Sequence, residues 1–304
     1  MRKALRRGLL LLLAASVLAV PAVANGRVLG DLYGSGDDAA DARRSGRSLN
    51  VVGLTGDGRL VRFSDDAPGR TRSIGRVKGL SGDRSLVGID YRVQDGKLYG
   101  VGNAGGIYTL SASNATASKV SQLTVGLVGN AFGVDFNPAA NRLRVVSDMG
   151  QNLRHNIDDA TATTPPLAGM TQSDGTLTIP PAATPAAGIS GAAYTNNDLD
   201  ANTATTLFDV DTANDNVVVQ SPANAGALAP TGRLMVDAGS SVGFDIYSRV
   251  RFGVTQGNRG LATVAVLGRY GLFQVNLLTG KLSRVGGFRA DTQVVDIAIP
   301  LDQA

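Results

Sequence analysis

The sequence predicts an all-β fold, specifically a β-propeller of five four-stranded blades. Three observations lead to this prediction. A short strand pattern recurs five times along the chain, and a hairpin-like pattern follows each of its first four copies. Glycine is abundant, with 39 residues, while tryptophan and cysteine are absent. Many short strands joined by tight turns have this composition, and four strands in about 40–50 residues are typical of a propeller blade.

The recurring strand carries an aspartate at one fixed position. Its five copies are SLVGIDY, AFGVDFN, ISGAAYT, SVGFDIY and TQVVDIA, where the position is held by Asp90, Asp135, Ala193, Asp245 and Asp296. The copies are separated by 45, 58, 52 and 51 residues. The hairpin partners that follow are KLYGV with IYTLS, RLRVV with NLRHN, TTLFDV with NVVVQ, and TVAVL with LFQVNL. Each copy therefore predicts the first strand of one blade.

The two ends of the repeat complement one another. NVVGL–TGDG–RLVRF, residues 50–63, contains later strands of a blade without a first strand, and QVVDIAIP, residues 293–300, is a first strand with nothing after it. We expect the C-terminal strand to pair with the N-terminal strands in one composite blade, because ring closure removes exposed sheet edges. A sixth blade would have to come from the irregular segment 169–188.

These repeats resemble a known family. VGIDYRVQDGKLYGVG, GAAYTNN, GFDIYS and above all FNPAANRLRVVSDMGQNLR are similar to domain-of-unknown-function family 4394. The resemblance covers residues 49–299 and implies an exported, propeller-like bacterial protein with no established reaction. The segment HNIDDATATTPPL, which begins at His155, departs from the family pattern.

The N-terminal segment has the three parts of a secretory signal peptide. Four basic residues within the first seven precede thirteen uncharged residues, Gly8 to Val20, and an Ala-x-Ala site ends at Ala24. The apolar run is shorter than the roughly 20 residues that a membrane-spanning helix needs. We expect a signal peptide at residues 1–24, a flexible tether at 25–47 and a single β-propeller domain at 48–304. The mature protein is expected to be periplasmic or secreted, without an integral membrane segment, and monomeric.

Charge and cysteine content exclude several functions. Residues 1–24 hold four of the 29 basic residues and no acidic residue, which leaves 25 of each sign in the mature chain. A balanced charge gives no support for binding nucleic acid. Without cysteine, disulfides and thiolate metal sites are impossible.

The repeated aspartates are candidate metal ligands. In a propeller, the first strand of each blade lines the central channel, so Asp90, Asp135, Asp245 and Asp296 could converge there. Oxygen ligands suit a hard cation such as Ca²⁺ or Mg²⁺. Alternatively, each carboxylate accepts backbone N–H bonds from the following turn and fixes the geometry of its blade. The substitution at Ala193 agrees with this structural role, which we favour.

A second polar cluster lies beside the predicted channel strand of the second repeat, AFGVDFN. It contains the candidate ligand-binding residues Asn137, Arg144, Asp148, Asn152 and Arg154. Paired guanidinium, carboxylate and amide groups could hold a carboxylate or the hydroxyl groups of a sugar. The alternative is a polar network that joins two blades, with Arg144 and Asp148 as partners.

Two further features are not expected to be functional sites. His155, near Ser147 and Asp148, lacks a Gly-x-Ser-x-Gly nucleophile pattern and shares its strand face with Leu153 and Ile157, so we expect a packed ring. DVDTANDN, residues 209–216, has Ala213 and Asn214 where a calcium loop needs an oxygen ligand and glycine. It predicts a polar turn between two strands.

The sequence thus predicts an exported β-propeller scaffold that binds a small ligand or a protein without catalysis. The alternative is a hydrolase or lactonase-type enzyme that uses a divalent cation in the channel as a Lewis acid. A purely structural role in the cell envelope is a third possibility. An enzyme needs carboxylates that converge on an open pocket, whereas a scaffold uses them to hold turns.

Overall fold

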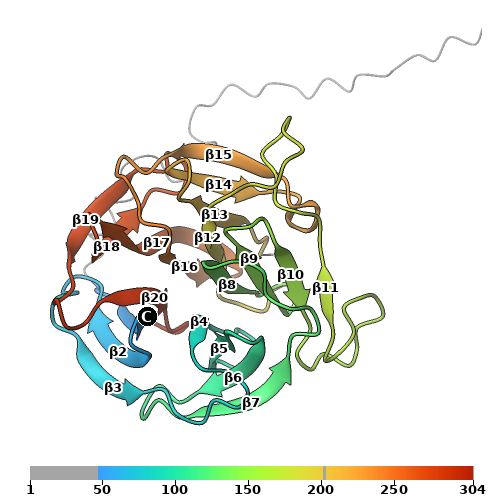
Figure 1. The fold of residues 1–304 in the computed structure, drawn as a ribbon, viewed down its shortest axis with the longest axis horizontal. Helices are drawn as coiled ribbons and strands as arrows, with labels where there is room; N and C mark the ends of the chain where they lie inside the picture. The colour runs from blue at the N-terminus through green and yellow to red at the C-terminus, as the bar shows by residue number, and fades with distance from the viewer. Residues whose placement is uncertain (1–46, 201–202, 304) are drawn as a thin grey trace, which may run out of the picture. The chain divides into compact units, whose positions relative to one another are not determined.

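The computed structural model describes residues 47–200 and 203–303. The predicted signal peptide and all of the predicted tether except Arg47 lie outside these residues. The described part of the chain forms five four-stranded antiparallel sheets, and its one helical element is a short 3₁₀ turn at Ala223–Ala225. Figure 1 shows the sheets arranged around a centre as the five blades of a propeller, which confirms the predicted fold.

The strands follow the predicted repeat, with the first strand of each unit innermost in its blade. The first blade contains β20 (Val294–Ala298), β1 (Asn50–Thr55), β2 (Arg59–Ser64) and β3 (Arg72–Arg76). The second contains β4 (Leu86–Tyr91), β5 (Leu98–Gly102), β6 (Gly106–Leu110) and β7 (Ala117–Gln122). The third contains β8 (Phe132–Asn137), β9 (Arg142–Ser147), β10 (Asn152–His155) and β11 (Thr171–Ser173). The fourth contains β12 (Ile189–Tyr194), β13 (Leu207–Asp211), β14 (Asn216–Gln220) and β15 (Leu228–Arg233). The fifth contains β16 (Val242–Arg251), β17 (Val254–Val266), β18 (Arg269–Val275) and β19 (Leu282–Gly287).

The first blade is composite, as the two incomplete repeats predict. β20 pairs with β1 in an antiparallel register that places Val52 opposite Ala298 and Leu54 opposite Asp296. β1 then continues the sheet through β2 to β3. Strands from both ends of the described chain therefore share one sheet, and β20 covers the inner edge of β1 that would otherwise be exposed.

The segment between β10 and β12 contributes no sixth blade among the described residues. It holds only β11, the outermost strand of the third blade, and is otherwise irregular. The polar turn predicted for DVDTANDN is present at residues 212–215, between β13 and β14. Asp211 Oδ1 accepts bonds from the backbone N–H groups of Ala213 and Asn214, both at 3.0 Å. Local side-chain acceptors of this kind hold many polar turns.

Glycine brings the innermost strands close together. A Cβ atom added to Gly133 of β8 would lie 2.5 Å from the backbone nitrogen of Ala192 in β12. Comparable close approaches to the next blade occur at the equivalent glycines of three other inner strands, Gly88, Gly191 and Gly243. Each of these glycines lies two residues before the repeated Asp position. The close approach therefore directs the side chains at that position into a narrow centre.

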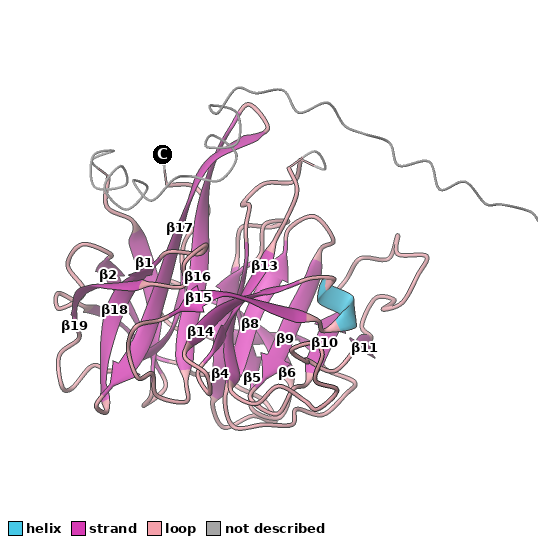
Figure 2. Ribbon diagram, turned by 90° about the horizontal axis from the view of Figure 1, so that it is seen from above, coloured by secondary structure: helices cyan, strands magenta, loops and turns pink. Residues whose placement is uncertain are grey.

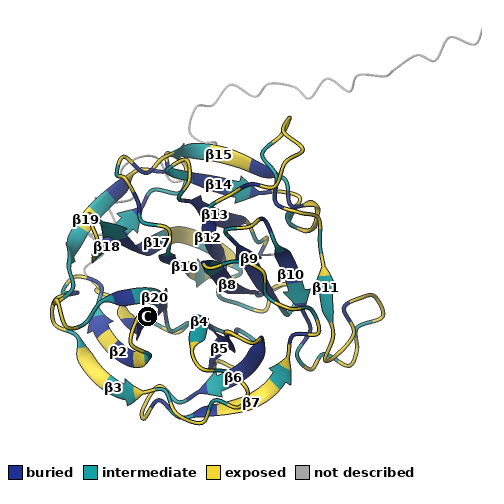
Figure 3. Ribbon diagram, viewed as in Figure 1, coloured by how far each residue is buried: buried dark blue, intermediate teal, exposed yellow. Residues whose placement is uncertain are grey.

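Burial decreases from the centre of the ring outward. The innermost strands are mostly buried, whereas the outer strands β3, β7 and β15 are mostly exposed (Figure 3). The blades pack through apolar clusters; Tyr99, Phe136 and Leu143, for example, join the second blade to the third. The hairpin of β16 and β17 is longer than the repeat predicts and extends beyond the neighbouring strands (Figure 2).

Candidate functional site

The repeated aspartates join neighbouring blades. Asp90 Oδ2 in β4 accepts a hydrogen bond of 2.8 Å from the backbone N–H of Phe136 in β8. The same relation links each of the other three to the inner strand segment of the next blade: Asp135 to Tyr194 at 3.2 Å, Asp245 to Ile299 at 2.6 Å and Asp296 to Ile89 at 2.7 Å. The favoured structural role is thus present, but the donors belong to the next blade and not to the turn after each strand.

The fourth blade interrupts this series. Ala193 of β12 is fully buried and offers no acceptor to the fifth blade. The backbone N–H of Asn196, just beyond β12, instead donates to Ser248 Oγ in β16 at 2.7 Å. A different pair of polar groups therefore makes the joint between the fourth and fifth blades.

Three of the aspartates also converge on one point in the channel. One carboxylate oxygen from each of Asp90, Asp135 and Asp245 lies within 4.8 Å of the other two. These side chains are only 4–6% exposed. Burial, reinforced by the neighbouring carboxylates, raises the pKa of Asp90 and Asp135 well above the ordinary value, and burial raises that of Asp245 to about 6. The arrangement is therefore favourable only when protons or a cation reduce the negative charge.

Asp296 is the fourth predicted metal ligand and lies at the edge of this group. It is half-buried, and burial raises its pKa well above the ordinary value, with Asp245 as a repelling neighbour. The structure therefore brings all four predicted residues to the channel, with Asp296 outside the tightest group of three.

Arg144 is the centre of a buried polar network. Its side chain is 1% exposed and donates four hydrogen bonds of 2.6–3.1 Å. The acceptors are the Oδ1 atom of Asn152, the Oδ2 atom of Asp174, the Oδ1 atom of Asn224 and the hydroxyl of Tyr194. Since Tyr194 and Asn224 belong to the fourth blade, the network joins the third blade to the fourth.

The prediction that Arg144 pairs with Asp148 was wrong. The guanidinium pairs with Asp174 at 2.7 Å, and Asp174 also accepts two bonds from Arg154. Asp148 follows the last residue of β9 and instead accepts a bond from the backbone N–H of Asn130. Asn137 Oδ1 accepts from the backbone N–H of Ala140 in a turn. Arg144, Asn152 and Arg154 are thus brought together, while Asn137 has its main bond elsewhere and Asp148 is separate.

Asp209 lies near Arg144, and the sequence did not predict it as a site residue. It is fully buried in β13, and neither carboxyl oxygen has a hydrogen-bond partner within the described residues. Burial raises its pKa to about 8, although the Arg144 cation acts in the opposite direction. The carboxyl group is therefore mainly protonated at neutral pH.

His155 is held by two hydroxyl groups. Its ring nitrogens lie 2.8 Å from Ser121 Oγ and 2.9 Å from Thr171 Oγ1, and the side chain is fully buried. Burial lowers its pKa to about 4, so the ring is neutral at neutral pH. Ser147 Oγ lies near the backbone nitrogens of Met149 and Gln151 instead. The contacts of His155 are those of a packed polar ring, as expected.

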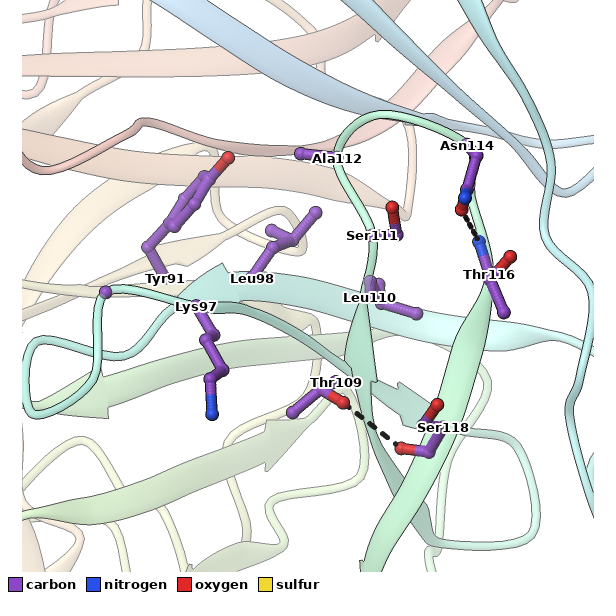
Figure 4. Close-up of a pocket in the computed structure, with 11 residues that line it drawn as sticks. Tyr91, Lys97, Leu98, Thr109, Leu110, Ser111, Ala112, Asn114, Thr116 and Ser118 are labelled. Atoms are coloured by element: carbon purple, nitrogen blue, oxygen red, sulfur yellow. Dashed lines mark hydrogen bonds between the residues drawn. The ribbon is translucent and has the colours of Figure 1, made fainter.

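A groove opens beside the end of β4. It has a volume of about 490 Å³ and is formed by Tyr91, the turn into β5 and the hairpin of β6 and β7 (Figure 4). Its polar lining groups come from Lys97, Thr109, Ser111, Asn114, Thr116 and Ser118. Tyr91 follows Asp90 directly, and burial together with Asp90 and Asp245 raises the pKa of Tyr91 to about 12. Tyr91, Leu98 and Leu110 of the groove pack in the apolar cluster between the first and second blades. The Asp90 side chain instead points from β4 toward the third blade, where it meets Phe136.

Together, the composite first blade and the acidic centre define a five-bladed β-propeller with a buried cluster of carboxylates on its inner strands. The chain belongs to the family described as domain of unknown function DUF4394, whose model matches residues 59–298. A comparison with curated proteins found no match. No helix in the described residues is long and apolar enough to cross a membrane.

Solved structures with a similar chain trace share little sequence with this protein. One is a protein of unknown function from Bacteroides thetaiotaomicron VPI-5482, with 13% identity and a TM-score of 0.40 over 84% of this chain and 68% of that one. Another, from Lactobacillus plantarum, has 12% identity and a TM-score of 0.38 over 83% of this chain and 99% of that one. A third is the structure described as YCF48 bound to D1 peptide, with 14% identity and a TM-score of 0.34 over 75% of this chain and 60% of that one.

Proposed function

We propose that this protein is an exported, non-catalytic binding module that takes a small polar ligand in the groove beside β4. The composition of the groove is the observation that supports this proposal. Its lining offers hydroxyl, amide and ammonium groups around an apolar floor of Leu98 and Leu110, with no carboxylate or imidazole. Small-molecule sites commonly have volumes of about 300–1,000 Å³ and combine apolar walls with a few polar groups.

The groove favours ligands that accept hydrogen bonds. The Lys97 side chain is 62% exposed, with its ammonium nitrogen 3.7 Å from Asp95, so it can turn toward a bound anion at little cost. The hydroxyl groups of Thr109 and Ser118 line the same surface (Figure 4). A small molecule with several hydroxyl groups and one carboxylate matches this combination.

The alternative, a hydrolase or lactonase-type enzyme, has less support. Its favourable observation is the convergence of Asp90, Asp135 and Asp245. However, each of these side chains is at most 6% exposed and accepts a backbone hydrogen bond from the next blade. Carboxylates with these contacts hold neighbouring blades together. A substrate could reach them only if the inner strands moved apart.

The predicted ligand-binding cluster is also better explained as a contact between blades than as a ligand site. Arg144 and Asn152 are 1% and 2% exposed, and each donates a hydrogen bond to the fourth blade, at Asn224 and Ala223. We propose that they hold this blade in place. Among Arg144, Asn152 and Arg154, a ligand could reach only Arg154, whose side chain is 22% exposed.

Export and the monomeric state are part of the same proposal. The basic, apolar and small-residue segments of residues 1–24 support a cleaved signal peptide and a periplasmic or secreted location. N-terminal sequencing of the protein recovered from culture fractions tests this point. A mature chain that begins at Asn25 outside the cytoplasm is the expected result; an uncut chain in the cytoplasm would contradict it.

Calorimetric titration tests the groove. Glucose, glucuronate, citrate and glutamate serve as probes, and Thr109→Val and Lys97→Met are the test variants. Thr164→Val, at an exposed position outside the groove, is the matched control. We expect saturable binding of a hydroxylated carboxylate that both groove variants weaken at least tenfold and the control leaves unchanged. Binding that is insensitive to the groove variants would place the site elsewhere, and absence of binding by every probe would count against this ligand class. Turnover of a lactone or ester that Asp135→Asn abolishes would favour the enzyme.

A further inference from the structure

We infer that the central channel binds one calcium-sized divalent cation through Asp90, Asp135 and Asp245. The inference goes beyond the proposed function and does not depend on the groove. A cation in this position would hold together the inner strands of the second, third and fifth blades, because one ligand comes from each of β4, β8 and β16.

The distances suit an ion of this size. The three oxygen atoms lie within 4.8 Å of one another. Ca²⁺ binds oxygen ligands at about 2.3–2.6 Å, so ligands on opposite sides of the ion are about 5 Å apart. Mg²⁺ demands near-ideal octahedral geometry at about 2.0–2.1 Å, whereas Ca²⁺ accepts irregular ligand sets such as carboxylates from three separate strands. The donors are all oxygen, and this chemistry favours a hard cation.

The joints between blades leave ligand oxygens available. Asp90 uses Oδ2 for the bond to Phe136, and Asp135 uses Oδ1 for the bond to Tyr194. Asp245 accepts a bond of 2.6 Å at each oxygen, from the backbone N–H of Ile246 at Oδ1 and of Ile299 at Oδ2. A carboxylate has about four lone-pair sites, so each of the three side chains keeps at least one for a cation. No lysine or arginine within residues 47–200 and 203–303 forms an ion pair with any of the three. A cation can therefore bind without breaking the joints.

A buried hydroxyl group provides a second, independent observation. Thr263 of β17 is fully buried, and its Oγ1 atom has no hydrogen-bond partner among the described residues. Thr263 pairs with Gly243, and a Cβ added to this glycine would lie 2.6 Å from Thr263 Oγ1 and 2.9 Å from Asp296 Oδ1. The hydroxyl and the carboxylate thus face the same space beside the channel. Water bound to a cation could donate to both oxygens, which accounts for a polar side chain that otherwise lacks a partner.

Terbium luminescence tests the inference directly. Tb³⁺ replaces Ca²⁺ at oxygen sites and emits when a nearby aromatic side chain transfers energy to it; the chain has no tryptophan, so tyrosine is the donor. Tyr91 is adjacent to Asp90. For the exported protein, we expect saturable Tb³⁺ emission on excitation of tyrosine, and we expect excess Ca²⁺ to remove this emission. Asp135→Asn should weaken Tb³⁺ binding at least tenfold, and Tyr91→Phe should reduce the emission while the Ca²⁺-dependent rise in Tm remains.

Two controls separate a cation site from structural effects. Asn can still accept the Tyr194 N–H bond, so Asp135→Asn should fold, and in EDTA its Tm should equal or exceed that of the wild type because a repelling charge is removed. Asp291→Asn, at an exposed position, should not alter Tb³⁺ binding. If Asp135→Asn does not fold, Asp90→Asn provides the same test. Absence of saturable emission together with identical melts in Ca²⁺ and EDTA would overturn the inference, as would unchanged binding by a folded Asp135→Asn or Asp90→Asn variant. Groove variants such as Thr109→Val should bind Tb³⁺ normally, so failure of the groove proposal remains distinguishable.

Discussion

The carboxylate of Asp90 accepts a hydrogen bond from the backbone N–H of Phe136, the residue one position beyond the equivalent Asp135 in the next blade. A side chain that repeats with the blades thus satisfies a backbone group of its neighbour. Four of the five blades present such an aspartate, and the fourth blade has Ala193 in its place. The repeat in the sequence is therefore also a repeat in the contacts between blades.

Removing this acceptor should destabilise the ring. Asp90→Ala leaves the Phe136 N–H buried without a partner, whereas Asp90→Asn retains an acceptor and removes the charge. We expect the free energy of unfolding of the Ala variant to be about 1–3 kcal/mol below that of the Asn variant. Urea denaturation in EDTA measures the difference. Equal stabilities would show that the bond contributes nothing, and the exposed control Asp291→Ala should change stability by less than about 0.5 kcal/mol.

The close approach of β8 and β12 should tolerate no side chain at Gly133. The added Cβ of Gly133→Ala would meet the backbone of Ala192 at 2.5 Å and of Gly191 at 2.7 Å, and backbone atoms in a packed sheet cannot easily move. We expect a loss of about 1–3 kcal/mol, measured by denaturation. Gly126→Ala is the matched control, because a Cβ there has no neighbour within 4 Å. A neutral Gly133→Ala would mean that the inner strands can separate.

Arg144 should contribute far more to stability than an exposed arginine. Arg144→Met leaves Asp174, which is 4% exposed, without one of its two cations and removes three further bonds. Breaking a buried pair in this way costs about 3–5 kcal/mol. Arg289→Met disrupts a pair whose side chains are 68% and 72% exposed and should cost at most about 1 kcal/mol. Similar losses for the two variants in thermal or chemical unfolding would contradict the joint between the third and fourth blades.

Asp209 should make the protein less stable as the pH rises. Its pKa is about 8 in the folded protein and near 3.8 in the unfolded chain, so between these values the folded state binds one more proton. The free energy of unfolding then falls by about 1.4 kcal/mol per pH unit from this group, and the contribution is lost as the pH passes through about 8. Asp209→Asn should remove this part of the slope between about pH 6.5 and 7.5, measured by chemical denaturation in EDTA. An unchanged slope would show that Asp209 is ionised in the folded protein.

The architecture could be predicted because it repeats. The pattern around Asp90 and Asp135 sets the inner strands, and the incomplete repeats at residues 50–63 and 293–300 predict the composite blade. Strand pairing within each blade is local, so hydrophobic alternation and turn residues are sufficient to place it. The extra length of the β16–β17 hairpin was not predicted, since the repeat ends near Tyr247.

The partners of the buried polar groups could not be predicted in the same way. Arg144 binds Asp174 and Asn224, which lie 30 and 80 residues further along the chain in an irregular loop and a 3₁₀ turn. Proximity in sequence suggested Asp148 instead. The joints made by Asp90 and its equivalents also cross between blades, so their donors become visible only when the strand order is known. No local pattern distinguishes Asp209 from Asp211 and Asp215, the other aspartates of the DVDTANDN segment.

The position of β20 affects the order in which the protein can fold. The innermost strand of the first blade comes from residues 294–298, so β1 reaches the ribosome exit long before its inner partner has been synthesised. Blades two to five can assemble from consecutive segments, but the ring can close only when nearly the whole chain is present. If the chain crosses a membrane before the ring closes, it can cross in an unfolded form. A product truncated before Val294 would expose the inner edge of β1 to proteases and chaperones.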